Sequence, residues 1–329
     1  MRFVVIGAGA VGGVVGGRMA QHGHDVVLVA RGAHREAIAE RGLRVEWPED
    51  SVTLTVPVVG HPSELTFGDD DVVLVAVKSQ DTAGVVEALA AASAPPETPI
   101  VCLQNGVANE PAFLRRFGRV YGVPVMAPTS HLQPGVVQAH TRRAAAIFDV
   151  GRWPAGDDPI ASAVSDAFRA SGFESVARPD IARWKYSKLL MNLGNPVDAL
   201  CPRDDDARRL VTMAREEGEK VLAAAGIDHV SEQEDRARRG DLLRMAPIDG
   251  QRRQGGSTWQ SLMRGLPVEV DFLNGEIVLL GRLHGVSTPV NTLLQQTTHD
   301  AVTARTPPNS IPAGALLTTL GIAERSPDD

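Results

Sequence analysis

Short apolar runs alternate with longer segments of mixed polarity through the first half of the chain. The segment 11–22 predicts a helix, and the apolar runs predict strands at 3–6, 25–30, 52–58, 71–77, 100–103 and 120–126. Uninterrupted runs of Val, Leu and Ala such as 72–77 are typical of parallel strands that are buried on both faces of a sheet. We therefore expect a doubly wound α/β domain in this half of the chain.

Longer helical patterns dominate from about residue 180 onward. Apolar positions recur at helical spacing in the segments 184–200, 205–225, 268–284 and 288–304. Ser231 and Glu234 have the spacing of a capping box, which marks the start of another helix. We therefore predict a boundary near Arg178 and Pro179, with an α/β domain over 1–178 and an all-α domain over 179–329. The polar tail at 324–329 is predicted to be mobile.

The composition narrows the classes of protein to which the chain can belong. Lys and Arg number 33 against 40 Asp and Glu, and the net charge of -7 excludes the generally basic surface that binds nucleic acid or anionic lipid. Aromatic residues make up 4%, which argues against stacking platforms for single-stranded nucleic acid. Cys102 and Cys201 supply neither a disulfide scaffold nor a Cys-rich metal site, and the nine His show no H-x-x-x-H spacing, so we expect no metal.

The apolar stretch that follows Met1 and Arg2 could be mistaken for a signal peptide or a membrane span. It is rich in glycine from Gly7 to Gly17 and ends at Arg18. That length falls short of the roughly 20 apolar residues that a spanning helix needs. We therefore assign the stretch to the fold and expect a cytoplasmic protein without membrane contact.

A glycine-rich loop follows the first predicted strand and opens the first predicted helix. Its pattern is G-x-G-x-x-G, formed by Gly7, Ala8, Gly9, Ala10, Val11 and Gly12. In this context the glycines let the backbone turn tightly and approach a diphosphate at the helix N-terminus. The alternative is a glycine-rich packing turn without a ligand. We favour a dinucleotide-binding site and thus a Rossmann-type parallel sheet domain.

The residues after the second predicted strand bear on the choice between NAD and NADP. Sites for NAD usually carry Asp or Glu there to bind the ribose hydroxyl, whereas Arg suits a 2′-phosphate. This chain has Arg31 at that point, with Arg35 close by, and no acidic residue from Val26 to Arg35. The planar guanidinium donates several hydrogen bonds to phosphate oxygens. We therefore expect NADPH; the alternative is that Arg31 is only a solvated loop residue.

Two more polar residues follow predicted strands. Lys78 comes after the strand 71–77, and Asn105 comes after the strand 100–103. Ligands of open parallel sheets bind outside the carboxyl ends of the strands. We therefore expect Gly9, Arg31, Lys78 and Asn105 to line one crevice, although Lys78 or Asn105 taken alone could equally be an ordinary loop residue.

A lysine and two asparagines lie within an apolar segment of the second half. Lys188, Asn192 and Asn195 are spaced i, i+4 and i+7, which places them on one face of a helix. Because unpaired buried polar groups are costly, these side chains must reach solvent or find partners. A solvated stripe is the alternative, and Lys185, almost one turn earlier, competes as a functional lysine. Pro196 leaves the carbonyl of Asn192 without its usual helical donor.

Taken together, these residues resemble the ketopantoate reductase (2-dehydropantoate 2-reductase) family over nearly the whole chain. The resemblance rests on 7–12, 77–78, 103–106, Lys188 with Asn192, Ser257 with 269–271, and 274–289. It implies transfer of a hydride from NADPH to the keto carbon of a 2-oxo acid, in a cleft between the two domains. Reduction of 2-dehydropantoate to pantoate, a step of pantothenate biosynthesis, is the reaction we expect first.

The resemblance also implies a role for each candidate residue. Lys188 matches the general acid, which protonates the developing alkoxide and stabilises its charge. Glu269 matches the acid that binds substrate and helps to position the lysine, although a lone Glu is more often surface charge. Asn192, Asn195 and Ser257 match polar substrate ligands. Asn105 matches a group at the junction of cofactor and substrate.

Departures from the family pattern leave alternatives open. Asn195 lies one position earlier than the matching Asn of the family, and the segment 254–258 is richer in glycine. Other members share the catalytic set, so reduction of another 2-oxo acid, or of an imine in an opine-type reaction, remains an alternative. A non-enzymatic NADPH-binding sensor, which would not need Lys188, is the alternative of a different class. The sequence contains no signal for oligomeric state, and a homodimer is compatible with it.

Overall fold

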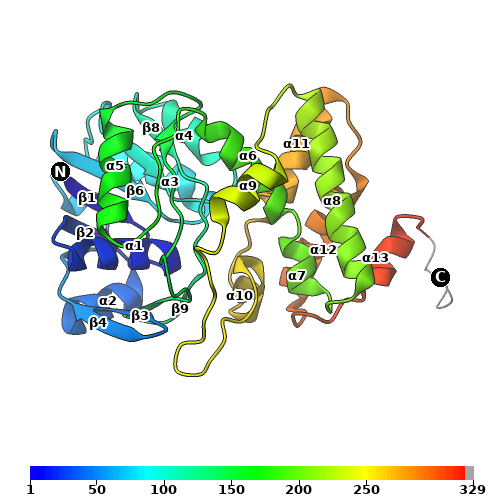
Figure 1. Cartoon of the computed structure of the whole chain (residues 1–329), viewed down its shortest axis with the longest axis horizontal. Coiled ribbons are helices and arrows are strands. Elements are labelled where there is room, and N and C mark those ends of the chain that lie inside the picture. Colours follow the sequence, from blue (N-terminus) through cyan, green and yellow to red (C-terminus); the bar gives the residue numbers. More distant parts are fainter. Residues whose placement is uncertain (323–329) are drawn as a thin grey trace. The chain divides into compact units, whose positions relative to one another are not determined.

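The computed structural model describes residues 1–322, and the tail 324–329 lies outside the described residues. The chain divides into two compact units. The first unit comprises Met1–Lys185 and Val230–Arg253, and the second comprises Tyr186–His229 and the chain from Gln254 onward (Figure 1). Within residues 1–322, no helix is both long enough and apolar enough to cross a membrane.

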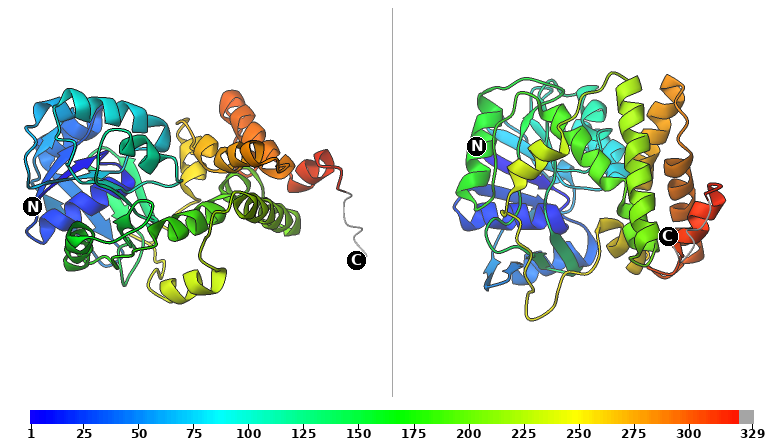
Figure 2. Two further views of the ribbon diagram at one scale, coloured as in Figure 1. Left: turned by 90° about the horizontal axis from the view of Figure 1, so that it is seen from above. Right: turned by 45° about the vertical axis from the view of Figure 1, so that its right-hand side comes forward.

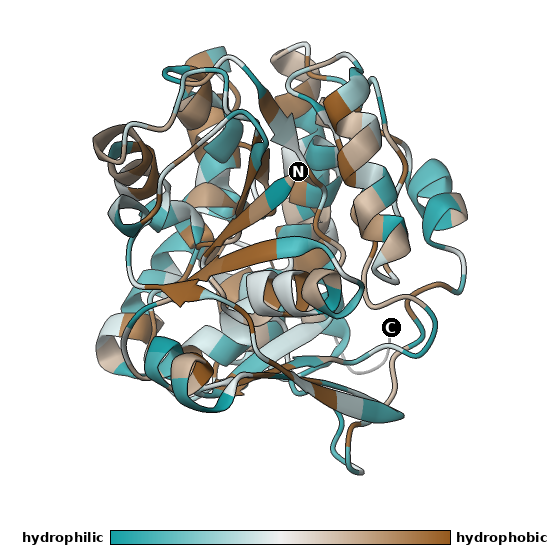
Figure 3. Ribbon diagram, turned by 90° about the vertical axis from the view of Figure 1, so that its left-hand side faces the viewer, coloured by the Kyte–Doolittle hydropathy of each residue, from teal (hydrophilic) through white to brown (hydrophobic). Residues whose placement is uncertain are grey.

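A seven-stranded sheet forms the centre of the first unit. In spatial order its strands are β11 (Gly151–Arg152), β8 (Val120–Gly122), β7 (Ile100–Cys102), β6 (Asp71–Val75), β1 (Arg2–Ile6), β2 (Asp25–Val29) and β5 (Val58–Val59). Neighbouring strands are parallel except β11 with β8, so the carboxyl ends of the other six strands share one edge. The predicted parallel sheet is confirmed, and its strands are largely hydrophobic along their length (Figure 3).

Helices cover both faces of this sheet (Figure 2). They are α1 (Ala10–Gln21) and α5 (Pro159–Ala170) on one face, and α3 (Thr82–Ala91) and α4 (Asn109–Leu114) on the other. Alternate residues of each central strand pack into one or the other of two hydrophobic clusters. In β1, Phe3 and Val5 join the first cluster, while Val4 and Ile6 join the second. Because both faces are buried, the strands are apolar throughout instead of alternating with polar residues.

A second sheet lies in the same unit, and the sequence pattern does not predict it. It follows α2 (Gly32–Arg41), and its strands in spatial order are β4 (Asp50–Leu54), β3 (Leu43–Trp47), β10 (Val136–Ala139) and β9 (Thr129–Gln133). The predicted strand at 52–58 is therefore wrong, because its first part belongs to β4 and its end forms β5 of the larger sheet. Pro57, which has no N–H to donate to a ladder, lies between the two.

The first unit also contains two 3-10 turns and a helix from its second segment, Val230–Arg253. These are η1 (Pro62–Glu64), η2 (Ser79–Asp81) and α9 (Glu232–Arg239). The predicted capping box at the start of α9 is confirmed. The N–H of Glu234 donates to Oγ of Ser231 at 3.2 Å, and the N–H of Ser231 donates to Oε2 of Glu234 at 2.8 Å.

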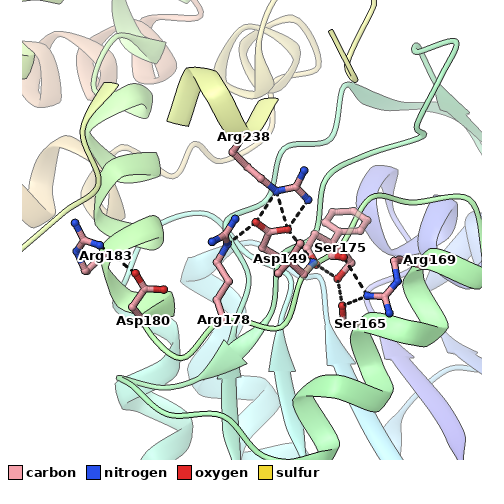
Figure 4. Close-up of polar contacts among 10 residues, drawn as sticks. Asp149, Ser165, Arg169, Ser175, Arg178, Asp180, Arg183 and Arg238 are labelled. Carbon is pink, nitrogen blue, oxygen red and sulfur yellow. Dashed lines mark hydrogen bonds and ion pairs between the residues drawn. The ribbon is translucent and has the colours of Figure 1, made fainter. Parts of the chain in front are cut away.

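Asp149 explains why the segment carrying α9 packs with the first unit. Its side chain is 2% exposed and accepts from two arginines, with Oδ2 2.7 Å from Nε of Arg178 and Oδ1 2.7 Å from Nη2 of Arg238 (Figure 4). The predicted boundary assigns 179–185 and 230–253 to the second domain, whereas the packing groups both segments with the first unit. As a division between cofactor and substrate functions, the boundary at 178 stays a prediction.

The second unit is helical. Helix α6 (Ile181–Asn192) spans the division between the units, and the rest are α7 (Asn195–Leu200), α8 (Asp205–Ala224), α10 (Ser257–Met263), η3 (Val270–Phe272), α11 (Asn274–His284), α12 (Pro289–Ala304) and α13 (Ala313–Thr319). The predicted helices at 205–225 and 288–304 are confirmed to within one residue at each end. The predicted helix at 268–284 is shorter, because η3 precedes it and α11 begins only at Asn274.

The predicted helix at 184–200 is broken in the structure. Helix α6 ends at Asn192, and α7 begins at Asn195 after a two-residue turn. Pro196 has no N–H to donate to the carbonyl of Asn192, and proline is favoured in the first turn of a helix, where no such bond is needed. The chain therefore restarts a helix at this point instead of continuing α6.

Candidate active site

The glycine-rich loop links β1 to α1 and has Gly9 as the N-cap of the helix. No described side chain caps α1, and its first turn contains no acidic residue. The first backbone N–H groups of a helix have no partner within the helix, and here they belong to Ala10, Val11 and Gly12. Three uncapped donors at the positive end of a twelve-residue helix fit an anion such as a diphosphate.

Two glycines of the loop meet different requirements. A Cβ at Gly12 would overlap the carbonyl oxygen of Gly7, so the packing of the loop itself requires glycine there. A Cβ at Gly9 would meet no atom within 4 Å. Gly9 therefore opens onto space that a ligand can occupy, and the loop fits a dinucleotide.

The sheet topology places the other cofactor candidates on the same edge. Strands β7, β6, β1 and β2 are adjacent and parallel, and the residues that follow them are Asn105, Lys78, Gly9 and Arg31. Arg31 is exposed and serves as the N-cap of α2, without a side-chain capping bond. The four residues thus share one edge, whereas their roles in binding stay predictions.

Hydrogen bonds join the loops after β6 and β7. The carbonyl of Asn105 accepts from Nδ2 of Asn109 at 2.8 Å and from Oγ of Ser79 at 3.3 Å. Nε2 of Gln104 donates to the carbonyl of Val77 at 3.0 Å. The backbone beside Lys78 and Asn105 is therefore fixed by buried side chains that the sequence pattern does not single out.

Lys185, the competing candidate for a functional lysine, forms an ion pair inside the first unit. Its side chain is 2% exposed, and Nζ lies 2.7 Å from Oε1 of the fully buried Glu110. Nζ also donates to the carbonyl of Gln104 at 2.8 Å. Burial raises the pKa of Glu110, and the positive charge of Lys185 opposes that rise. Lys185 is therefore withdrawn from solvent with its charge paired, whereas Lys188 is half-buried, and the choice between them as the functional lysine stays a prediction.

In the second unit, Lys188 and Asn192 lie one turn apart on one face of α6. Lys188 is half-buried, Asn192 is 5% exposed, and each interacts with other groups of the protein. Asn195 does not share this face, because it is the first residue of α7. The prediction that all three residues lie on one helical face is therefore wrong for Asn195, for the reason that breaks the helix.

A buried polar network holds the chain at this break. Nδ2 of Asn274 donates to the carbonyl of Leu193 at 3.0 Å and to Oδ1 of Asn291 at 2.9 Å. Nδ2 of Asn291 donates to Oε2 of Glu217 at 2.7 Å. Asn274 and Asn291 are fully buried. The sequence pattern does not predict this network, because periodicity does not distinguish polar residues at core positions of a helix from a solvated face.

Ser257 and Glu269, the remaining candidates, lie at the starts of two short helical segments. Ser257 is the first residue of α10, which packs against α7, and the N–H of its N-cap Gly256 donates to Oδ2 of Asp198 at 3.3 Å. Glu269 is the N-cap of η3 and is half-buried. The roles of both side chains toward a substrate stay predictions.

The two cysteines are buried thiols. Burial raises the pKa of Cys201 to about 11 and that of Cys102 well above its ordinary value. Neither is poised as a thiolate nucleophile at neutral pH. Among residues 1–322, no three His, Cys, Asp or Glu side chains gather as metal ligands.

Comparison with known proteins connects this arrangement to one family. The family model for ketopantoate reductase PanE/ApbA matches residues 3–154, and the model for the C-terminal part of the same family matches residues 180–301. The chain belongs to the ketopantoate reductase family. Members of this family are NAD(P)-dependent 2-oxo acid reductases, so the protein is an oxidoreductase of that kind.

Individual relatives match over almost their full length. The chain is 30% identical to 2-dehydropantoate 2-reductase of Pyrococcus horikoshii over 303 residues, which cover 89% of this chain and 95% of that protein. A ketopantoate reductase family protein from Ralstonia eutropha has a similar structure, with a TM-score of 0.78 and 28% identity over 93% of this chain and 99% of that one. D-mandelate dehydrogenase, in a complex with NADH and anilino(oxo)acetate, shares the fold with a TM-score of 0.79 and 21% identity over the same shares.

Proposed function

We propose that this ketopantoate reductase family member reduces 2-dehydropantoate to pantoate with NADPH. The observation that carries the proposal is the pairing of Lys188 with Asn192 on one face of α6, in a chain whose relatives of that name match over most of both lengths. Fold similarity alone would not support a substrate, since one fold hosts many activities.

The first unit binds the cofactor in this proposal. The N–H groups at the start of α1 bind the diphosphate, and Arg31 binds the 2′-phosphate. The absence of an acidic residue from Val26 to Arg35 disfavours NADH, whose ribose hydroxyl lacks an acceptor there. Lys78 and Asn105 bind toward the nicotinamide end, because they follow the strands on the other side of β1 from Arg31.

The second unit supplies the proton and the substrate ligands. When bound, the reduced nicotinamide supplies a hydride to the keto carbon. The ammonium of Lys188 stabilises the negative charge that develops on the carbonyl oxygen and then donates a proton to it, which gives the 2-hydroxy acid. Glu269 contacts the substrate and positions the lysine, and Asn192, Asn195 and Ser257 hydrogen-bond to the substrate.

A comparison of substrates tests this proposal. We expect NADPH oxidation by the purified protein to show its highest kcat/KM with 2-dehydropantoate, against pyruvate, 2-oxoisovalerate and mixtures of oxo acid with amine. A higher value with 2-oxoisovalerate or with an amine mixture would assign the protein to a different reductase activity. Binding of NADPH without oxidation by any of these compounds would favour a sensor.

A homodimer and a place in pantothenate biosynthesis belong to the same proposal. The support for a dimer is a structure of dimeric ketopantoate reductase from Staphylococcus aureus, which shares the fold with a TM-score of 0.72 and 20% identity over 93% of this chain and 100% of that one. Light scattering coupled to size-exclusion chromatography measures the mass in solution directly, and a monomer mass would contradict this part of the proposal.

A further inference from the structure

His34 connects two backbone segments of the first unit that are far apart in sequence. It lies in the first turn of α2, three residues after Arg31, and is half-buried. Its Nε2 lies 2.7 Å from the carbonyl oxygen of Ala8, which belongs to the glycine-rich loop. Its Nδ1 lies 2.8 Å from the backbone nitrogen of Gly135, in the turn between β9 and β10. Both ring nitrogens therefore face backbone groups.

These two partners fix the protonation state of the ring. The N–H of Gly135 can only donate, so Nδ1 must accept and carries no proton. The carbonyl of Ala8 can only accept, so Nε2 must carry the proton. The ring is therefore the neutral Nε2–H tautomer, since an imidazolium would direct a second N–H at that of Gly135. Burial lowers the pKa of His34, and the bond to Ala8 only partly opposes this shift, which favours the same neutral form.

The hairpin of β9 and β10, whose turn donates to His34 through Gly135, packs against the neighbouring helices. A Cβ at Gly135 would lie 3.1 Å from Cβ of Ala37 in α2. A Cβ at Gly13 in α1 would lie 2.6 Å from Cγ1 of Val137 in β10. The ring of His131 in β9 lies against that of His34, with centroids 4.1 Å apart. The hairpin of β9 and β10 thus lies against both α1 and α2, and the half-buried imidazole of His34 contacts it through Gly135 and His131.

We propose that His34 is a positioning residue for the nucleotide: it holds the glycine-rich loop and the start of α2 in one arrangement, and so sets the preference for a 2′-phosphorylated dinucleotide. The proposal rests on the proposed function. The loop at Ala8 precedes the donors for the diphosphate, and the start of α2 carries Arg31 for the 2′-phosphate. Since both ring nitrogens are occupied by backbone groups, His34 acts through these segments and not as a direct ligand.

Three variants test this role. His34→Ala removes both hydrogen bonds, whereas His34→Gln keeps one donor and one acceptor in a side chain that does not titrate. His284→Ala, at the exposed end of α11, is the matched control. Dissociation constants for NADPH and NADH are measured by titrating nucleotide fluorescence. The kcat for reduction of 2-dehydropantoate is measured at saturating NADPH.

We expect His34→Ala to weaken NADPH binding by roughly tenfold, with kcat changed by less than about twofold, and to weaken NADH binding less, so that the preference for NADPH shrinks. His34→Gln should restore most of the NADPH affinity, and His284→Ala should behave as the unsubstituted protein. A thermal unfolding scan shows whether each variant is folded. If His34→Ala does not fold, His34→Asn, whose shorter side chain loses the bond to the carbonyl of Ala8, takes its place and should show a loss of NADPH affinity in the same direction; an unchanged affinity in that folded variant would overturn the proposal.

A spectroscopic measurement on the nucleotide-free protein completes the test. Nitrogen-15 shifts of the histidine rings, assigned through the signal lost in His34→Gln, should show the neutral Nε2–H tautomer near neutral pH. An Nδ1–H tautomer or an imidazolium there would overturn the proposal, as would unchanged nucleotide affinities in His34→Ala. If the unsubstituted protein binds neither nucleotide, the proposed function fails and the cofactor role of His34 fails with it; binding that is insensitive to His34 overturns the His34 proposal alone.

Discussion

Lys185 and Glu110 form an ion pair that is almost completely withdrawn from solvent, with Nζ 2.7 Å from Oε1. Nζ of Lys185 also holds the carbonyl of Gln104, the residue directly before Asn105. A buried ion pair adds little net stability over an apolar pair, because both charges lose their hydration. What the pair does provide is a fixed position for the turn that leads from β7 to Asn105.

Replacing only one partner of this pair should be costly. In Lys185→Met the carboxylate of Glu110 remains buried without a counter-charge, and we expect the free energy of unfolding to fall by about 3–5 kcal/mol. Urea unfolding near pH 8, where Glu110 has the greatest tendency to ionise, measures this loss. The double variant Lys185→Met with Glu110→Leu should recover much of it, and additive losses in the double-mutant cycle would show that the two side chains are not coupled.

His140 should make stability depend on pH in the acid range. It is 4% exposed, and its Nε2 forms a hydrogen bond of 2.9 Å with Oγ of Ser130. Burial, and secondarily the charge of Arg253, lowers the pKa of His140 from 6.5 to about 4. The unfolded chain therefore binds a proton below pH 6.5 that the folded protein binds only near pH 4, so unfolding is favoured as the pH falls through this window.

The size of this effect follows from the shift of the pKa. The contribution of His140 is fully present above pH 6.5, and up to about 3 kcal/mol of the free energy of unfolding is lost as the pH falls toward 4. Urea unfolding at several pH values measures it. His140→Gln, which keeps a hydrogen-bonding side chain but does not titrate, should show a correspondingly flatter dependence. Equal slopes in the two proteins would contradict the assignment of this proton to His140.

The network at Asn274 should matter for both stability and substrate binding. Asn274→Ala leaves the buried carbonyl of Leu193 and Oδ1 of Asn291 without this donor, and we expect a loss of about 1–3 kcal/mol in the free energy of unfolding. Because Leu193 directly follows Asn192, the KM for the oxo acid should rise while the dissociation constant for NADPH stays unchanged. Gln296→Ala, exposed on α12, is the control and should leave both quantities unchanged. A selective change in NADPH binding would contradict this account.

The positions of the cofactor candidates could be predicted because they depend on local patterns. Uninterrupted apolar runs reveal buried parallel strands, and parallel strands bring their carboxyl ends to one edge, so Gly9, Arg31, Lys78 and Asn105 follow from the sequence. The same reasoning fails where a residue's environment depends on distant segments. Lys185 and Lys188 look alike in sequence, and only Glu110, more than seventy residues away, makes one of them a buried ion-pair partner.

Other features escaped prediction for related reasons. The second sheet pairs β3 with β10 across about ninety residues, and short strands with mixed polarity give no clear period. Pro196 is a local signal for the end of α6 at Asn192. The apolar spacing nevertheless continues through the break and predicts one longer helix. The donor to the carbonyl of Leu193, in the turn between α6 and α7, comes from Asn274, which no local pattern connects with it.

The kcat/KM for NADPH-dependent reduction of 2-dehydropantoate by Lys188→Ala tests the central claim most directly. If Lys188 protonates the alkoxide, kcat/KM should fall by roughly 100- to 10,000-fold while the dissociation constant for NADPH is unchanged. Lys220→Ala, an exposed lysine on α8, should retain the activity of the unsubstituted protein. A folded Lys188→Ala protein that binds NADPH and reduces 2-dehydropantoate at the unsubstituted rate would contradict the account.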